Sequence, residues 1–267
     1  MATGNGGSAF GIQLRRWRHT RNVSQLQLAI HAGVSARHLS FIETGRALPS
    51  REMVLLLTVQ LRVPLRERNA MLLAAGFAPA YEQRSLDSVE MSAIREAVQR
   101  LLDAQEPYPA LAVDRQWNVV LGNRGARLLS EGVAPSLLGP SANVYRVILH
   151  PDGLRARIRN FDEYAGHLLA QLQHDVDLSG DPQLHALLAE VEKYPGLQNL
   201  SVPQTARTGV ALPLQLATSV GELAFVTTVA TFGTPYDVTV SELAVESFFP
   251  ADAETAQRVR AFAGGDR

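Results

Sequence analysis

The sequence predicts an all-α N-terminal domain of five helices, followed by an α+β domain with an antiparallel sheet and a helical middle. Three observations support this fold class. Apolar residues recur at helical spacing, between serines that can cap helices, over residues 9–80. Two short apolar runs at 110–113 and 117–121 precede a long helical stretch, and three more follow it. The net charge also differs between these two parts. Residues 1–85 carry a net charge of +7, and because the whole chain carries −1, the remaining residues carry −8.

Composition narrows the function classes. The 267 residues, 46% of them hydrophobic, can build one large core or two smaller ones. No run of 18 apolar residues predicts a membrane span, and the glycine-rich start MATGNGGSAFG lacks the basic and apolar regions of a secretory signal. Cysteine is absent, which excludes disulfides and thiolate metal sites and suits a reducing cytoplasm, the location we expect. A basic first third on an acidic remainder indicates a polyanion-binding module joined to a domain with another task.

The first helix is expected to begin near Ile12. Its spacing places Ile12, Leu14 and Trp17 inward and a set of arginines outward (Arg15, Arg16 and Arg18).

The next two helices have the spacing of a helix-turn-helix. Ser24 offers a cap for the helix QLQLAIHA, and Ala29 is small enough for a second helix to cross closely over it. Gly33 can adopt the positive φ of a sharp turn. After the turn, Leu39 and Ile42 share one face and, with Val34, are expected to anchor the following helix on the core.

The opposite face of that following helix suits base edges. Ser35 caps it, Arg37 can donate two hydrogen bonds to guanine, and Ala36 or Phe41 can pack on a thymine methyl group. Ser40 can donate or accept. Glu43, near the helix end, is expected to pair with a basic residue such as Arg15 or Arg16.

This stretch, SQLQLAIHAGVSARHLSFIETGRALPS, resembles the helix-turn-helix of the Xre/lambda-repressor-like regulators. The resemblance implies a five-helix domain whose third helix enters the DNA major groove, usually as a dimer on a two-fold operator. Carried onto this chain, the implied contacts to phosphates and bases come from Gln25, Ser35, Ala36, Arg37, Ser40, Phe41, Thr44 and Arg46.

Two further helices, REMVLLLTVQL after Pro49-Ser50 and LRERNAMLLAAG, complete the predicted domain, residues 9–80. The boundary is expected near residues 80–92. A helix then carries Ile94, Val98, Leu101 and Leu102 on one face. It is interpreted as an interdomain or dimer helix or as the first helix of the second domain, which is predicted over residues 92–263.

The second domain begins with an expected hairpin around Asp114-Arg115-Gln116. Helical segments follow, and the end returns to three strands: GVALPLQLATS, GELAFVTTVATFG and YDVTVSELAVESFF. Two strands, a helical middle and three strands is the order of elements in the PAS sensor fold, an order that other α+β domains share.

Several stretches between about residue 10 and residue 262 resemble the MmyB-like (MltR-type) transcription regulators. In the first third of the chain these stretches are SARHLSFIETGRALPSREMVLLL and PLRERNAMLLAAGFAPAYE. In the remainder they are EPYPALAVDRQWNVVLGN, LHPDGL, FDEYAGHLL and FGTPYDVTVSELAVESFFPAD. That resemblance implies a DNA-binding domain followed by a PAS-related ligand-binding domain, with a fatty-acid-like molecule as effector.

A pocket for such a ligand needs an apolar lining and a cation or several donors at its mouth. Arg146, among the apolar neighbours of NVYRVILHP, is the favoured anchor. Donors at positions matched by the resemblance are Asn123, His150, Asn160 and His167, each of which could equally make a structural hydrogen bond. Apolar candidates, each also explicable as core, are Trp117, Val119, Leu121, Val147, Leu168, Leu169, Phe225 and Phe232.

No enzyme is predicted. The sequence lacks the common enzyme motifs: a glycine-rich nucleotide-binding loop after a strand, GxxxxGK[ST], HExxH and GxSxG. His167 and His174 lie seven residues apart and could share a helix face, but no third metal ligand is evident. The expected partners are operator DNA, a second copy of the chain and a lipophilic small molecule, with no membrane insertion and no certain cofactor. The alternative is a DNA-binding regulator whose second domain only dimerises or docks a protein.

Overall fold

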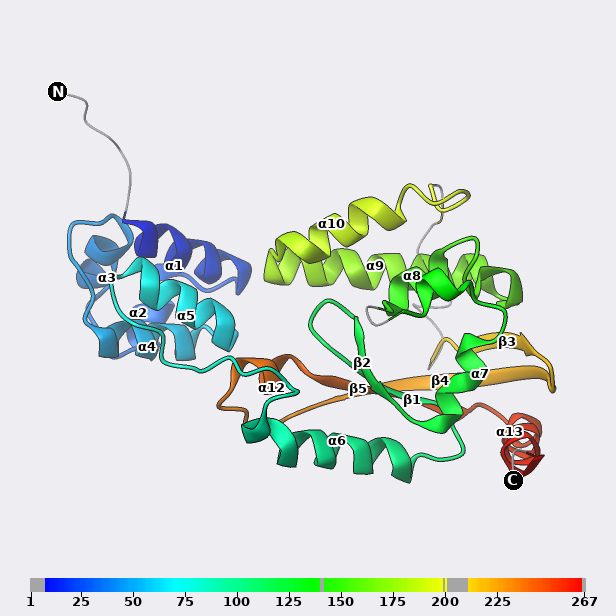
Figure 1. Ribbon diagram of the computed structural model, residues 1–267. Helices are drawn as coiled ribbons and strands as arrows, with labels where there is room; N and C mark the ends of the chain where they lie inside the picture. Colours follow the sequence, from blue (N-terminus) through cyan, green and yellow to red (C-terminus); the bar gives the residue numbers. More distant parts are fainter. Residues whose placement is uncertain (1–7, 140–141, 199, 201–210, 266–267) are drawn as a thin grey trace. The chain divides into compact units, whose positions relative to one another are not determined.

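The computed structural model describes residues 8–139, 142–198, 200 and 211–265. The chain divides into two compact units: Met1–Ser85 with Thr234–Ser241, and Leu86–Gly233 with Glu242–Arg267 (Figure 1).

The first unit contains a bundle of five helices: α1 (Ala9–Thr20), α2 (Gln25–His31), α3 (Ala36–Glu43), α4 (Arg51–Gln60) and α5 (Leu65–Ala74). The side chain of a preceding serine caps each of the first four, because its oxygen accepts a backbone N–H of the first turn. Gly33 has a φ of 64° between α2 and α3, as its place in the turn predicts. The all-α prediction for this part of the chain is confirmed.

Helix α1 corrects one sequence expectation. Ile12, predicted inward, is 59% exposed, whereas Arg18, predicted outward, is buried. Phe10, Leu14 and Trp17 form the inward face instead. A Cβ atom on Gly11 would lie 2.5 Å from the carbonyl oxygen of Glu43, so α1 and α3 approach each other too closely for any other residue there.

The segment Thr234–Ser241 belongs to the first unit through contacts with residues 82–84. The backbone N–H and guanidinium of Arg84 both donate to Asp237 Oδ2, at 3.3 and 3.2 Å, and the Thr239 hydroxyl donates to the Arg84 carbonyl at 2.6 Å.

The second unit is built on a five-stranded antiparallel sheet in the order β2-β1-β5-β4-β3. Its strands are β1 (Ala110–Val113), β2 (Val119–Gly122), β3 (Leu214–Thr218), β4 (Gly221–Thr231) and β5 (Ala244–Pro250). The first and last strands therefore pair side by side, which brings residues 110–113 against residues 244–247. The predicted α+β class with an antiparallel sheet and a helical middle is confirmed.

Helices cover both faces of this sheet (Figure 1). On one face lie α8 (Val144–Leu149), α9 (Phe161–Ser179) and α10 (Pro182–Val191), packed over a large apolar core. On the other face lies α6 (Ser92–Ala104), where Val98 and Leu102 pack against Ala110, Ala112 and Val245. Leu101, predicted on the inward face of α6, is 57% exposed. Among its described residues, this unit also contains α7 (Arg127–Ser130) and α13 (Ala253–Gly265), whereas α12 (Val238–Glu242) lies mainly in the segment that belongs to the first unit.

Two strand predictions need correction. The stretch 236–249, expected as one strand, begins with helix α12, because the Asp237 side chain accepts the backbone N–H of Thr239 at 2.8 Å and starts a helical turn. Strand β3 begins at Leu214, and residues 209 and 210 of the expected strand lie outside the described part of the chain. Helix α13, which the sequence analysis did not predict, follows the cap that Asp252 forms with the backbone N–H of Thr255 at 2.7 Å.

Candidate DNA interface and ligand pocket

Helix α3 presents a mixed polar and aromatic face. Leu39 and Ile42 are fully buried, which turns Arg37 to the exposed side and leaves Ala36, Ser40 and Phe41 half-buried beside it. The Arg37 guanidinium carbon lies 5.4 Å from the centre of the Phe41 ring. This stacking limits the conformations of the arginine and leaves its N–H groups free to turn toward a planar acceptor.

The other predicted DNA contacts border this face. Ser35 caps α3 by accepting the His38 backbone N–H at 3.1 Å, and the Thr44 hydroxyl donates to the Ser40 carbonyl at 2.8 Å. Arg46 and Thr44 are exposed. Gln25 is half-buried and donates its amide to Glu43 Oε2 at 3.0 Å, so its side chain is held on the bundle.

Glu43 pairs with Arg18, and not with Arg15 or Arg16 as predicted. Arg18 Nε and Nη2 lie 2.7 and 3.1 Å from the two carboxylate oxygens, and Arg18 Nη1 also donates to the Val23 carbonyl. Both side chains are buried. Arg18 lies one helical turn after Leu14 and so shares its inward face, whereas Arg15 and Arg16 point to solvent.

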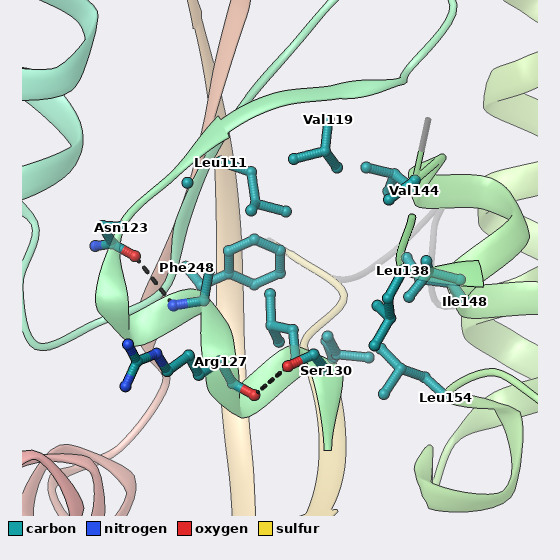
Figure 2. Close-up of a pocket in the computed structure, with 16 residues that line it drawn as sticks. Leu111, Val119, Asn123, Arg127, Ser130, Leu138, Val144, Ile148, Leu154 and Phe248 are labelled. Carbon is teal, nitrogen blue, oxygen red and sulfur yellow. Dashed lines mark hydrogen bonds between the residues drawn. The ribbon is translucent and has the colours of Figure 1, made fainter. Parts of the chain in front are cut away.

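The second unit contains an apolar pocket of about 390 Å³ (Figure 2). Figure 2 shows the Phe248 ring in the middle, Leu111 and Val119 on the sheet side, and Leu138, Val144, Ile148 and Leu154 on the opposite side. Polar groups lie at one edge, where Asn123, Arg127 and Ser130 come from α7 and the turn before it. A lining of this kind suits a lipophilic molecule with one polar end.

Of the predicted ligand residues, Asn123, Val119 and Val147 line this pocket. Asn123 has a structural role as well. Its Oδ1 accepts from the backbone N–H groups of Ala110 and Ala126, and its amide donates to the carbonyls of Leu102 and Tyr108. Its polar atoms therefore hold α6, β1 and the turn before α7 together.

Arg146 does not line the apolar pocket. Its Nε and Nη2 form a bidentate pair with Glu190, at 2.8 and 2.7 Å, in a shallow depression between α8 and α10. This contact lowers the pKa of the Glu190 carboxyl and raises that of Arg146. Glu190 also accepts from the Tyr194 hydroxyl at 2.8 Å. The guanidinium is satisfied by a partner 44 residues away, which local sequence did not reveal.

The other predicted residues are dispersed. The His150 ring lies edge-on to Tyr194, and Asn160 joins the start of α9 to β3 through Pro213 and Gln215. Phe225 is buried edge-on against Phe248. Several more candidates pack in the two cores: Leu121, Leu169 and Phe232.

Trp117, His167 and Leu168 line a second, smaller cavity, together with Tyr145, Tyr164 and Glu246. Sequence analysis did not single out Glu246, although an acidic residue in the largely apolar stretch AVESFF, at an inward-facing strand position, was a usable signal. Arg127 and Ser130 were missed because RGARLLSEG reads as an ordinary short helix.

Within the described ranges, no three acidic or histidine side chains gather closely enough to hold a metal ion. Likewise, no helix formed by these residues has the length and apolarity that a membrane crossing requires.

Residues 94–262 match the family described as "MmyB-like transcription regulator ligand binding domain", and residues 9–71 match the family "Helix-turn-helix domain". The chain is 34% identical over 84 residues to the "Uncharacterized HTH-type transcriptional regulator RghRB" of Bacillus subtilis (strain 168). This match covers 31% of the chain and 58% of RghRB, so the chain spans less than two thirds of that relative.

Two solved structures are also similar. The clp gene regulator ClgR from Corynebacterium glutamicum has 26% identity and a TM-score of 0.23, with 38% of this chain and 93% of that chain covered. An RNA-binding light-oxygen-voltage receptor has 13% identity and a TM-score of 0.27, with 96% of this chain and 64% of the receptor chain covered.

The matched families are those of transcription regulators, which are typically not enzymes. The chain belongs to the MmyB-like transcription regulators, in which a DNA-binding helix-turn-helix domain is joined to a ligand-binding domain.

Proposed function

We propose that a homodimer of this regulator reads a two-fold operator with helix α3 and that a fatty-acid-like molecule in the apolar pocket alters operator affinity. The observation that carries the proposal is the 390 Å³ apolar pocket in the ligand-binding domain of a DNA-binding regulator. Each methylene group transferred from water to such a lining contributes about 0.8 kcal/mol, so an acyl chain of several carbons supplies ample binding energy.

The head group of this ligand is assigned to the polar edge of the pocket. Arg127 is exposed there, and its guanidinium forms no hydrogen bond or ion pair with the residues that the structure describes. Ser130 adds a hydroxyl, which donates to the Arg127 carbonyl at 2.8 Å. Arg127 replaces Arg146 as the anchor in this proposal, because Glu190 already satisfies Arg146.

The ligand is tested by organic extraction of the purified protein and mass spectrometry of the extract. We expect a fatty acid or a similar lipid in the wild-type extract, and a rise of the melting temperature when fatty acid is added to stripped protein. Ala142→Phe, which places a ring in the pocket, is expected to abolish both results. Ala93→Phe, on the exposed face of α6, adds the same ring elsewhere and is expected to leave both unchanged.

A clean extract without any thermal shift would contradict the ligand and favour the second candidate, a dimerisation or docking domain with a closed core. Control of DNA binding is a separate claim, because a ligand shifts an equilibrium only through different affinities for two states. Equal operator affinity with and without fatty acid would refute control and leave ligand binding standing.

Arg37→Ala is expected to relax base preference at one position in each half-site. A bidentate arginine–guanine contact contributes about 1–3 kcal/mol of discrimination against a wrong base pair. The measurement is selection of bound sequences from a random DNA library, followed by competition between matched and mismatched sites at fixed salt.

Arg46→Ala is the matched control, since it also removes one exposed arginine beside α3. Because Arg46 is expected to contact a phosphate, it should strengthen binding to every DNA sequence equally. Its loss is therefore expected to weaken binding to all sequences by the same factor and to reduce the salt dependence of the binding constant. Unchanged specificity in Arg37→Ala would show that a different face of α3 meets the bases.

A further inference from the structure

The second cavity of the ligand-binding domain has a different chemistry from the apolar pocket. Its volume is about 60 Å³, and its walls come from α8, α9, β4 and β5. Val144 and Ile148 line both cavities. The smaller one adds a group of polar and aromatic side chains that the apolar pocket lacks: Trp117, Tyr145, Tyr164, His167, Gln171, Thr227 and Glu246.

Glu246 is an unusual residue for its position. It lies in the middle of β5, opposite Val229 of β4 and Leu111 of β1, and is only 7% exposed. Its Oε2 atom forms no hydrogen bond with any residue that the structure describes. Burial raises the pKa of this carboxyl to about 7, with no neighbouring cation to oppose the shift. An acid without a partner at such a site is costly to the fold and points to a ligand.

The groups around Glu246 indicate the charge of that ligand. The Tyr145 hydroxyl, on a residue 1% exposed, also lacks a hydrogen-bond partner among the described residues. The Trp117 ring lies edge-on to Tyr145 at 5.6 Å, and its indole N–H donates to Asp175. Tyr164 from α9 adds a third ring and is hydrogen-bonded to Thr227.

A buried carboxylate and a phenol oxygen that both lack hydrogen-bond partners among the described residues together favour a cation over an anion. The carboxylate accepts charge-assisted hydrogen bonds, and the Tyr145 oxygen can accept one more. A ligand carboxylate would instead meet the like charge of Glu246. His167, from α9, also lines this cavity.

We propose that this cavity binds the ammonium group of a small primary amine, with Glu246 as its counter-ion and the Tyr145 hydroxyl as a further acceptor. Glu246 and Tyr145 do not line the apolar pocket, so the amine site requires no lipid there. It gives the ligand-binding domain a second input, which reports a cationic metabolite.

The test uses the full chain in a Trp17→Phe background, so that Trp117 is the remaining tryptophan and its fluorescence reports the cavity. n-Propylammonium chloride, 1-propanol and propionate are titrated separately near pH 8. We expect a saturable response to the ammonium ion and none to the alcohol or the carboxylate over the same concentration range. Because Glu246 has a pKa of about 7, lowering the pH to about 6 should weaken the binding about tenfold.

Variants assign the effect to Glu246. Glu246→Gln keeps the shape and removes the charge, and should weaken propylammonium binding at least about tenfold, the effect of losing about 1.4 kcal/mol of charge-assisted contact. Glu192→Gln, an exposed glutamate after α10, removes the same charge and should leave binding unchanged. His167→Gln should retain the weakening at low pH, which separates Glu246 from the histidine.

The Trp17→Phe protein, in which the cavity is unaltered, is sufficient to overturn the proposal without the Glu246 variant. Equal responses to propylammonium and propanol, or no saturable response to the ammonium ion, would refute it. Unchanged ammonium affinity in Glu246→Gln would also refute it. Fatty-acid binding measured on the same samples shows whether the apolar pocket is intact, so failure of the amine site and failure of the lipid site are distinguishable.

Discussion

We expect Glu43→Ala to lower the free energy of unfolding of the helix-turn-helix domain by about 3–5 kcal/mol, the range for removal of one partner from a buried ion pair. The substitution leaves the Arg18 guanidinium buried without its carboxylate, and an unpaired charge in a protein interior is far more costly than a lost contact on the surface. Gln25 loses its acceptor in the same step. Urea denaturation of the full chain, followed by far-UV circular dichroism, measures the loss as an early helical transition.

The position of this pair explains why it should affect function. It joins α1 to the end of α3, where Gly11 already allows close approach of the two backbones. Loss of the pair should therefore loosen the face that carries Arg37, and operator affinity should fall in parallel with stability.

Two controls separate burial from charge. Glu52→Ala removes an exposed glutamate of the same domain and should have a much smaller effect. The double variant Arg18→Leu/Glu43→Leu replaces the whole pair by apolar side chains and should recover most of the stability, because no lone charge remains. If Glu43→Ala unfolds like the wild type, the pair does not contribute to domain stability.

Glu246→Gln is expected to stabilise the ligand-binding domain at alkaline pH and to have little effect near pH 5. The pKa of Glu246 rises from 4.5 to about 7 on folding, so the folded state binds the proton more tightly than the unfolded state. The stability that this proton provides is fully present below the unfolded pKa of 4.5 and is lost as pH rises through 7. A shift of this size corresponds to about 3 kcal/mol.

Glutamine cannot ionise, so the variant does not lose this part of its folding stability as the pH rises. The difference in free energy of unfolding between Glu246→Gln and wild type should therefore grow by about 2.5 kcal/mol between pH 5 and pH 8. Thermal and urea denaturation at both pH values measure it, with Glu192→Gln as the matched control. A difference that does not change with pH would mean that the Glu246 carboxyl has an ordinary pKa in the folded protein.

Local signals in the sequence were sufficient for the helix-turn-helix. The caps at Ser24 and Ser35, the turn at Gly33 and the core positions Leu39 and Ile42 act within one or two helical turns, so a reader of the sequence can evaluate each one. The short apolar runs, the turns and the order of elements in the second domain likewise predicted an antiparallel sheet around a helical middle. Its five strands confirm the class, although Asp237 begins a helix where a strand was expected.

The ligand-binding domain shows the limit of such signals. Arg146 among apolar neighbours looked like a buried cation in need of a ligand, but Glu190, on a helix that packs beside it only after folding, satisfies it. The side chain of Asn123 likewise makes its hydrogen bonds to four backbone groups of the protein.

The sequence by itself therefore determined the helix-turn-helix, the outward face of α3 and the class of the second domain, because caps, turns and periodicity are short-range properties of the chain. Tertiary structure decided which polar residues remain without partners. That depends on pairings across tens of residues, such as Arg18 with Glu43 and Arg146 with Glu190, and on the sheet register that buries Glu246 beside Tyr145. A side chain becomes available to a ligand only when no other part of the folded chain has satisfied it.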